Sequence, residues 1–373
     1  MTRSSSRLTA VLLSCASTCG PLADPLAAAD PPAAVAVAAA PVPRLLPVAL
    51  AEDDLVAVIA PASPARAEEM TEAAANLRRM GLRARVSPHA ADRDGYLAGS
   101  DEARAAELNR AFADPEVRMV LCARGGYGSP RLLDRLDYDL IRKNPKVLVG
   151  YSDITALLIA LRQRTGLVTF HGPIGKEFSG RAGLSPFAEE HFRGLLGPEP
   201  LPLGSPELAD WGGGKIRGAE ARRTIAPGAA EGILTGGNLS TIAALMGTPY
   251  EIDTRDAVLF LEDVNEEPFR IDRMLCQLRL AGKLAKARGI LLGGFTRCVA
   301  RTPSESWSLD EVIEDTFAKL GMPVLAGFPA GHLPEQPPLP IGIRVRLDAT
   351  ARTLAILEPA VSAATAGGSP SRP

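Results

Sequence analysis

Residues 120–173, VLCARGGYGSPRLLDRLDYDLIRKNPKVLVGYSDITALLIALRQRTGLVTFHGP, decide the fold. Two apolar runs in and beside this stretch, residues 117–123 and 147–150, are typical of buried strands. The first run ends in the glycine loop RGGYGS, and the second ends in Tyr-Ser-Asp before a helical run at residues 154–164. This alternation predicts βαβ units and a parallel sheet, with both polar loops at its carboxyl edge.

Ser152 stands where the second strand turns into a helix. A serine on such a turn exposes its hydroxyl beside the N–H groups of the helix start, and a neighbouring glycine loop can add another donor. The pattern departs from G-x-S-x-G because Ile154 replaces the second glycine. Ser152 and Asp153 are also good helix N-caps, and glycines also serve tight turns, so the turn alone leaves both interpretations open.

Composition excludes several classes of protein. A chain of 373 residues exceeds one typical core, so two domains are expected. The 41 basic and 43 acidic side chains nearly cancel, no basic run occurs, and aromatic residues are few, which argues against a nucleic-acid partner. No apolar stretch in the body of the chain reaches the length of a membrane span, so we expect no stable membrane insertion.

Cysteine and histidine spacing does not favour a metal site. The chain has five cysteines, none in a C-x-x-C pair, and four histidines without metal-ligand spacing. The unpaired cysteines of the body, Cys122, Cys276 and Cys298, fit a reducing compartment.

The first 53 residues differ in kind from the rest. Arg3 and Arg7 precede a short apolar run that ends at Cys15, and an Ala/Pro-rich tract follows. This is typical either of a weak export signal with a lipoprotein-like cleavage box or of a disordered tail. We expect residues 1–53 to lie outside the fold.

Strand and helix patterns alternate from residue 54 onward. We expect a parallel-sheet domain at 54–196, a Gly/Pro-rich linker at 197–230, a second α/β domain at 231–360 and a disordered tail at 361–373. In the second domain, a strand at 257–261 ends in the acidic loop EDVNEE, and a short strand at 324–328 ends in Pro-Ala-Gly-His, followed by a Pro-rich loop at 333–340.

Seven segments, in order along the chain, resemble the LD-carboxypeptidases, the muramoyltetrapeptide carboxypeptidase family of serine peptidases. They are AVIAPASP (57–64), ARGGYGS (123–129), VGYSDITALL (149–158), FHGP (170–173), LTGGNLS (234–240), LFLEDVNEEPFRIDRML (259–275) and GFPAGH (327–332). The resemblance implies an N-terminal parallel-sheet domain of the flavodoxin/amidotransferase-like kind and a smaller C-terminal α/β domain.

The resemblance also implies a Ser-His-Glu triad formed by Ser152, His332 and Glu262. The chemistry agrees, because a serine nucleophile needs a base in reach and an imidazole base needs a carboxylate to fix its tautomer. His171 also follows a strand at the same sheet edge and competes as the base. The rivals of Glu262 are Asp263, Glu266 and Glu267, although the last two precede a helix start, where acidic residues are common.

Further residues of the expected site lie on the same loops. The backbone N–H of Asp153, with Gly125 and Gly126, is expected to form an oxyanion hole. Candidate substrate-binding residues are Arg124, Asn238 and His171. Asn238 could equally cap the helix that follows it.

The function implied by the resemblance is removal of the C-terminal D-alanine from murein tetrapeptides during peptidoglycan recycling, by a cytoplasmic homodimer without metal or organic cofactor. Three alternatives stay open: an immunity-type peptidase that cleaves peptide–nucleotide antibiotic conjugates, a non-catalytic protein that binds cell-wall peptides, and a general esterase. If the leader is a true signal, the location is periplasmic or lipid-anchored instead.

Overall fold

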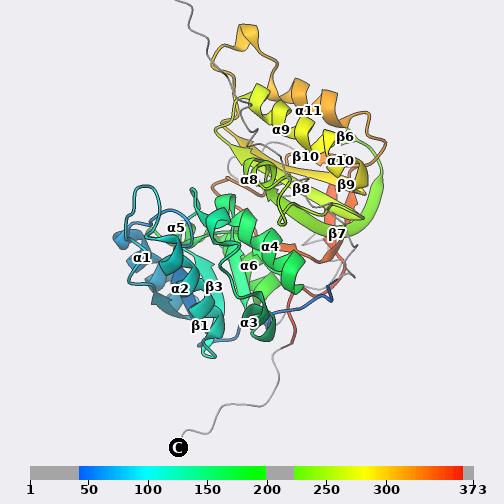
Figure 1. Cartoon of the computed structure of the whole chain (residues 1–373). Helices are drawn as coiled ribbons and strands as arrows, with labels where there is room; N and C mark the ends of the chain where they lie inside the picture. The colour runs from blue at the N-terminus through cyan, green and yellow to red at the C-terminus, as the bar shows by residue number, and fades with distance from the viewer. Residues whose placement is uncertain (1–41, 199–221, 364–373) are drawn as a thin grey trace, which may run out of the picture. The chain divides into compact units, whose positions relative to one another are not determined.

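Two β-sheets organise residues 42–198 and 222–363, the part of the chain that the computed structural model describes (Figure 1). The first half contains β1 (Leu55–Ile59), α1 (Ala67–Arg79), β2 (Arg83–Val86), α2 (Asp101–Ala113), β3 (Val117–Cys122), η1 (Ser129–Leu132), α3 (Tyr138–Lys143), β4 (Val147–Gly150), η2 (Ser152–Ile154), α4 (Thr155–Thr165), β5 (Thr169–His171), α5 (Gly175–Phe178) and α6 (Pro186–Leu196), where η marks a 3-10 turn. The second half contains β6 (Arg223–Ala226), β7 (Ala229–Asn238), α8 (Leu239–Ala244), β8 (Ala257–Val264), α9 (Pro268–Leu280), α10 (Lys283–Lys286), β9 (Gly289–Thr296), η3 (Pro303–Glu305), α11 (Leu309–Phe317), β10 (Val324–Ala326), β11 (Leu339–Ile341), β12 (Arg344–Asp348) and β13 (Thr353–Ile356).

The first sheet confirms the predicted parallel α/β architecture. Its order is β11-β5-β4-β3-β1-β2, and β1 to β5 run parallel. The order 2-1-3-4-5 is that of flavodoxin-like folds, in which the switch point lies between β1 and β3. The loops that follow these two strands therefore border the expected ligand crevice.

The edge strand β11 was not predicted, because its segment resembles a Pro-rich loop. In the structure Leu339 pairs with His171 and Pro340 pairs with Phe170, antiparallel to β5. Proline lacks a backbone N–H, but an edge strand leaves one side of its backbone unpaired and so tolerates it. The C-terminal half thus contributes a strand to the first sheet.

Helices cover both faces of the first sheet, because its inner strand β1 is apolar and buried throughout. Val56 of β1 belongs to the same buried cluster as Leu77 of α1, whereas its neighbour Ala57 belongs to the cluster of Phe112 in α2. Successive side chains of a strand point to opposite faces, so such a strand needs cover on both.

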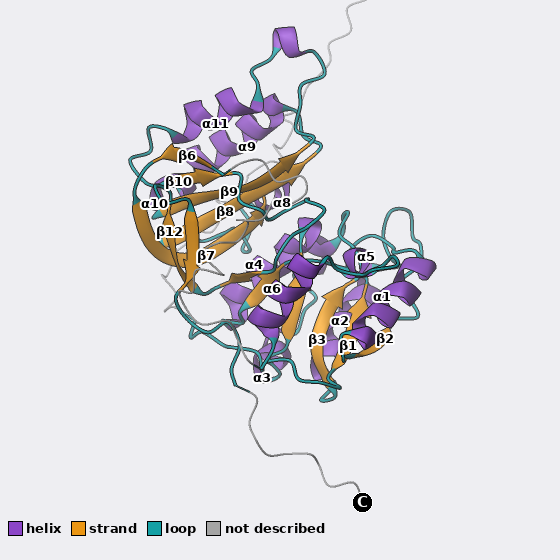
Figure 2. Ribbon diagram, turned by 180° about the vertical axis from the view of Figure 1, so that it is seen from behind, coloured by secondary structure: helices purple, strands orange, loops and turns teal. Residues whose placement is uncertain are grey.

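The second sheet has the order β13-β12-β7-β8-β9-β10-β6, with β7 to β10 parallel and the outer strands antiparallel. Helices α9 and α11 lie side by side over one face in both views (Figures 1 and 2). The side chains of Phe260 and Leu291 belong to the same buried cluster as Phe170 and Leu339 of the first sheet. One continuous apolar core therefore joins the two sheets.

Residues 42–53, expected to lie outside the fold, are part of it. The Leu45 N–H donates to the Gly166 carbonyl at 2.8 Å, the Leu50 N–H donates to the Leu196 carbonyl at 2.7 Å, and Leu50 is buried in the main core. Val361, expected in a disordered tail, is buried as well. Apolar residues near both ends thus add to the core. The rest of the predicted leader and tail, and residues 199–221 of the predicted linker, lie outside the described residues.

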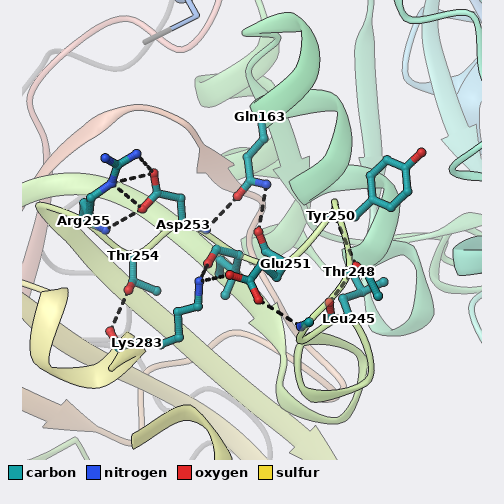
Figure 3. Close-up of polar contacts among 11 residues, drawn as sticks. Gln163, Leu245, Thr248, Tyr250, Glu251, Asp253, Thr254, Arg255 and Lys283 are labelled. Carbon is teal, nitrogen blue, oxygen red and sulfur yellow. Dashed lines mark hydrogen bonds and ion pairs between the residues drawn. The ribbon is translucent and has the colours of Figure 1, made fainter. Parts of the chain in front are cut away.

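Helix α4, which follows the Ser152 turn, is bound to the C-terminal half at both ends. At its start, the Thr155 hydroxyl accepts a hydrogen bond from the Asn238 N–H at 3.0 Å. Near its end, Gln163 donates to the Glu251 carbonyl at 3.1 Å and accepts from the Asp253 N–H at 2.8 Å (Figure 3).

Lys283 fixes the loop that receives Gln163. Its buried ammonium donates to the Glu251 carboxylate at 2.9 Å and to the Ile252 carbonyl at 2.7 Å (Figure 3). The hydrogen bond from Lys283 is the main reason that the pKa of Glu251 is lowered.

Within the described residues, no helix combines the length and apolar character needed to cross a bilayer.

We predict that Lys283→Met destabilises the protein by about 1–3 kcal/mol, because it leaves the Glu251 carboxylate and the Ile252 carbonyl without their partner. Urea unfolding at pH 7 measures the change. The control is Lys286→Met, an exposed lysine of the same short helix. An equal loss of stability in both variants would contradict this role for Lys283.

Candidate active site

Ser152 occupies a strained turn between β4 and α4. Its φ of 64° lies in the left-handed region, which a residue with a side chain adopts only where the surrounding structure imposes it. A Cβ on Gly150 would lie 2.7 Å from Ile154 Cγ2, so the side chain of Ile154 packs directly on this glycine. The N-cap of α4 is Ile154, without a side-chain capping bond, so Ser152 does not cap this helix.

The glycine loop after β3 lies against the Ser152 hydroxyl. A Cβ on Gly125 would lie 2.9 Å from Ser152 Cβ and 3.1 Å from its Oγ, so only glycine brings the backbone this close. Gly126 has a φ of 99° and packs against Ser63 of the loop after β1. The Ser63 N–H donates to the Gly125 carbonyl at 3.2 Å, and the Tyr127 N–H donates to Ser63 Oγ at 3.2 Å. The three loops thus meet at the carboxyl edge of the sheet.

The Asp153 side chain holds this loop in place. Its carboxylate accepts a hydrogen bond from the Ser129 N–H at 2.7 Å, and its carbonyl accepts one from the Ser129 hydroxyl. Burial raises the pKa of Asp153 to about 6, in spite of the hydrogen bonds from Ser129. The side chain of Asp153 therefore binds the glycine loop, so only the backbone N–H of Asp153 is left to contribute to the expected oxyanion hole.

His332 and Glu262 form a close pair in the second half. His332 Nδ1 lies 2.7 Å from Glu262 Oε2, and the backbone N–H of His332 donates to the same oxygen at 3.2 Å. Glu262 is 0% exposed and lies within β8, which continues to Val264, past the predicted strand end at residue 261. A Cβ on Gly331 (φ 109°) would lie 2.8 Å from Glu262 Oε2, so a glycine before His332 makes the approach possible.

The electrostatics of the pair suit a base. Burial lowers the pKa of His332, but the Glu262 charge and hydrogen bond outweigh this and raise it above its usual value. Glu262 therefore stabilises the protonated imidazole and also fixes which nitrogen carries the proton in the neutral form, because Nδ1 faces the carboxylate.

The rivals of Glu262 have other partners. Asp263 accepts from the Ser240 hydroxyl at 2.7 Å and from the Asn238 amide at 3.2 Å, and so holds the start of α8. Glu266 pairs with an arginine of α9 at 3.8 Å, and Glu267 pairs with Arg301 at 3.3 Å. Of the four acidic candidates, Glu262 is the one whose carboxylate contacts His332 in the described residues.

His171 does not take the place of His332. It is fully buried, and burial lowers its pKa to about 3, so the ring is neutral. Within the described residues neither of its ring nitrogens has a hydrogen-bond partner. Its ring packs edge-on against Phe260, with ring centroids 4.9 Å apart.

The other two candidate substrate-binding residues differ in how far their side chains are exposed to solvent. Asn238 is 5% exposed, and its side-chain oxygen accepts from the Thr241 N–H at 3.0 Å, so it caps α8. Arg124 is exposed beside Gly125, and its guanidinium donates to the Pro64 carbonyl at 3.3 Å. Arg124 is therefore the accessible member of the set.

Two further residues near His332, Tyr151 and Glu177, were not among the predicted site residues, although Tyr151 lies in the quoted segment VGYSDITALL. The Tyr151 ring packs edge-on against His332, with centroids 4.8 Å apart, and so connects the Ser152 turn with the imidazole. The Tyr151 hydroxyl donates to Glu177 Oε1 at 3.0 Å.

No group of three or more His, Cys, Asp or Glu side chains among residues 42–198 and 222–363 is arranged to hold a metal ion.

Comparison with known proteins agrees with the segments quoted above. Residues 56–172 match the LD-carboxypeptidase N-terminal domain, and residues 231–347 match the LD-carboxypeptidase C-terminal domain. The chain is 42% identical over 316 residues to the probable murein peptide carboxypeptidase of Bacillus subtilis (strain 168), covering 85% of this chain and 95% of the relative. It is 32% identical over 290 residues to the murein tetrapeptide carboxypeptidase of Pseudomonas aeruginosa, covering 75% and 88%.

A solved structure is also similar. The microcin C7 self-immunity protein MccF in complex with aspartyl sulfamoyl adenosine has a TM-score of 0.75 and 28% identity, covering 85% of this chain and 100% of that one.

We predict that Glu262→Gln lowers the pKa of His332, because burial is then opposed only by the smaller effects of Asp263 and Glu177. NMR titration of the histidine Cε1–H signals measures this, with His332→Gln identifying the signal. Glu189→Gln, on the surface of α6, is the control and should leave the titration unchanged. A His332 pKa that stays raised in Glu262→Gln would show that another group sets it.

Proposed function

This chain belongs to the LD-carboxypeptidase family and is a serine-type hydrolase, and from this we propose that it removes the C-terminal D-alanine from murein tetrapeptides with Ser152, His332 and Glu262 as its triad. The observation that carries the proposal is the 2.7 Å contact between His332 and a fully buried Glu262. The strained Ser152 turn and the edge-on contact of its neighbour Tyr151 with His332 support it.

In the first step, Ser152 Oγ attacks the carbonyl of the residue before D-alanine, and His332 Nε2 accepts the hydroxyl proton. Glu262 holds the Nδ1 proton, which leaves Nε2 free to act as the base, and its charge stabilises the imidazolium that forms. The Ser152–carbonyl bond forms, and the carbonyl oxygen becomes an oxyanion.

Backbone N–H groups stabilise that oxyanion. We assign this role to Asp153, at the start of the helical turn, and to the glycine loop at Gly125 and Gly126, which packs against the Ser152 hydroxyl. Donors that are fixed before the reaction stabilise the developing charge without reorganisation. The buried Asp153–Ser129 contact keeps the glycine loop at this distance.

His332 then gives its proton to the amine of D-alanine as the C–N bond breaks, and an acyl-enzyme ester remains on Ser152. A water molecule gives a proton to His332 and attacks the ester. The Ser152–acyl bond breaks, the serine recovers its proton from His332, and the tripeptide acid is released. Each step conserves atoms and charge without a cofactor.

Recognition of the substrate's free carboxylate needs a cation near the site. Arg124 is exposed next to Gly125, and a guanidinium suits a carboxylate through paired hydrogen bonds. Asn238 and His171, which are buried, act by supporting the site. A cytoplasmic role in peptidoglycan recycling and a homodimeric state follow from the family and belong to the same proposal.

The similarity to MccF supports one alternative, hydrolysis of a peptide–nucleotide conjugate by the same triad. The reaction differs only in the leaving group and in the pocket that receives it. A non-catalytic protein that binds cell-wall peptides is a less economical account, because such a protein has no need of a strained serine beside a buried Glu–His pair.

We predict that the full-length protein releases D-alanine from a murein tetrapeptide and does not shorten the matching pentapeptide, with mass spectrometry as the measurement. Ser152→Ala should lower kcat by roughly 10⁴- to 10⁶-fold, as expected when a triad nucleophile is removed. Ser185→Ala, which removes only the N-cap of α6, is the control and should keep its activity.

If neither peptide is cut but aspartyl sulfamoyl adenosine conjugates are, the alternative substrate class is correct and the triad stands. If the wild-type protein cuts none of them but binds the tetrapeptide, the protein is a binding module and the proposed function is wrong.

A further inference from the structure

We propose that Tyr151 and Glu177 position the His332 imidazole against Ser152, as a second support beside Glu262. The inference rests on the proposed triad. It assigns a role to two residues outside that triad.

Tyr151 contacts both partners of the proton transfer. It precedes Ser152 in the chain, so its backbone is continuous with the strained turn. Its ring meets the His332 ring edge-on, with centroids 4.8 Å apart and planes at 69°. A shift of His332 relative to the turn must therefore displace a buried aromatic ring, and such rings have well-defined packing.

Glu177 anchors that ring through the hydroxyl. Tyr151 donates to Glu177 Oε1 at 3.0 Å, and Glu177 Oε2 accepts from the Ile174 N–H at 3.0 Å. The Lys176 N–H donates to the carbonyl of Ala123, just past the end of β3, at 3.2 Å. A chain of hydrogen bonds thus runs from the carboxyl edge of the sheet through Glu177 to Tyr151, and the ring contact extends it to His332.

The back of the Tyr151 ring is also held. The ring of His171 packs against it edge-on at a centroid distance of 5.9 Å. His171 is fully buried and pairs, through β5, with Gly150 just before the turn. The packing therefore leaves Tyr151 little room to rotate away from His332.

The protonation states suit this arrangement. Burial raises the pKa of the Tyr151 phenol well above its usual value, so the hydroxyl remains a donor. Burial also raises the pKa of Glu177, while the hydrogen bonds from Ile174 and Tyr151 favour its charged form.

The charge of Glu177 also affects the pKa of His332. The ionisable groups that act on His332 are Glu262 and Asp263 from β8, Glu177 from α5 and, as a neutral ring, His171 from β5. The three carboxylates favour the imidazolium. Glu177 is therefore distinguishable from a purely structural residue, because its neutralisation changes the titration of His332.

The test combines kinetics with a titration of the full-length protein. In Glu177→Gln, which keeps the shape of the side chain and removes its charge, the His332 pKa and the acid limb of kcat/KM should both move roughly 0.5–1 pH unit lower. Tyr151→Leu should lower kcat by about 10- to 100-fold with little change in KM, because the base is misplaced. Tyr151→Phe keeps the ring and should retain most of the activity.

The controls are Glu189→Gln, an exposed glutamate of α6, and Tyr138→Phe, whose hydroxyl bonds to the Leu133 carbonyl away from the site. An unchanged His332 pKa in Glu177→Gln, or equal kcat in Tyr151→Leu and the wild type, would overturn the proposal. The NMR titration needs no substrate, so it decides on Glu177 even if no murein peptide is cut. If Tyr151→Leu does not fold, the titration of Glu177→Gln still decides.

Discussion

The structure depends on the pairing of Glu262 with His332. A buried carboxylate is stable only when it is paired, and Glu262 of β8 is fully buried. The ring and the backbone N–H of His332 both turn toward one of its oxygens. Gly331 makes that approach possible, since a side chain there would collide with Glu262. Strand β8 and the loop after β10 are thereby held together, and Glu262 orients the His332 imidazole.

Ser152, the proposed nucleophile, follows β4 of the other sheet, so the proposed site forms only where the two halves of the fold are held together. The two sheets share a continuous apolar cluster, and β11 crosses from the C-terminal half to the edge of the first sheet. Helix α4 is tied at both ends, through Thr155 and Gln163. These contacts hold the half that carries Ser152 against the half that carries His332.

Strain at Ser152 is maintained by the same packing. A left-handed φ costs on the order of 1–3 kcal/mol for a residue with a side chain and persists only where neighbours impose it. Here Gly150 accommodates Ile154, Gly125 lies against the serine, and Asp153 fixes the loop that carries Gly125. The turn is held from several sides. This packing supports the proposed nucleophile, although Ile154 stands where a G-x-S-x-G turn has its second glycine.

The sequence by itself determined the parallel α/β sheet, the Ser152 turn and the segments that carry Glu262 and His332, because strand periodicity, glycines and helix starts are local properties of the chain. Only the tertiary structure distinguished Glu262 from Asp263, buried His171 and made Asn238 a helix cap, because each depends on which distant side chains share a buried space. It also brought residues 42–53 and a Pro-containing edge strand into the fold. Those segments lack a local pattern, and the apolar surface that they cover is formed by residues far away in the chain.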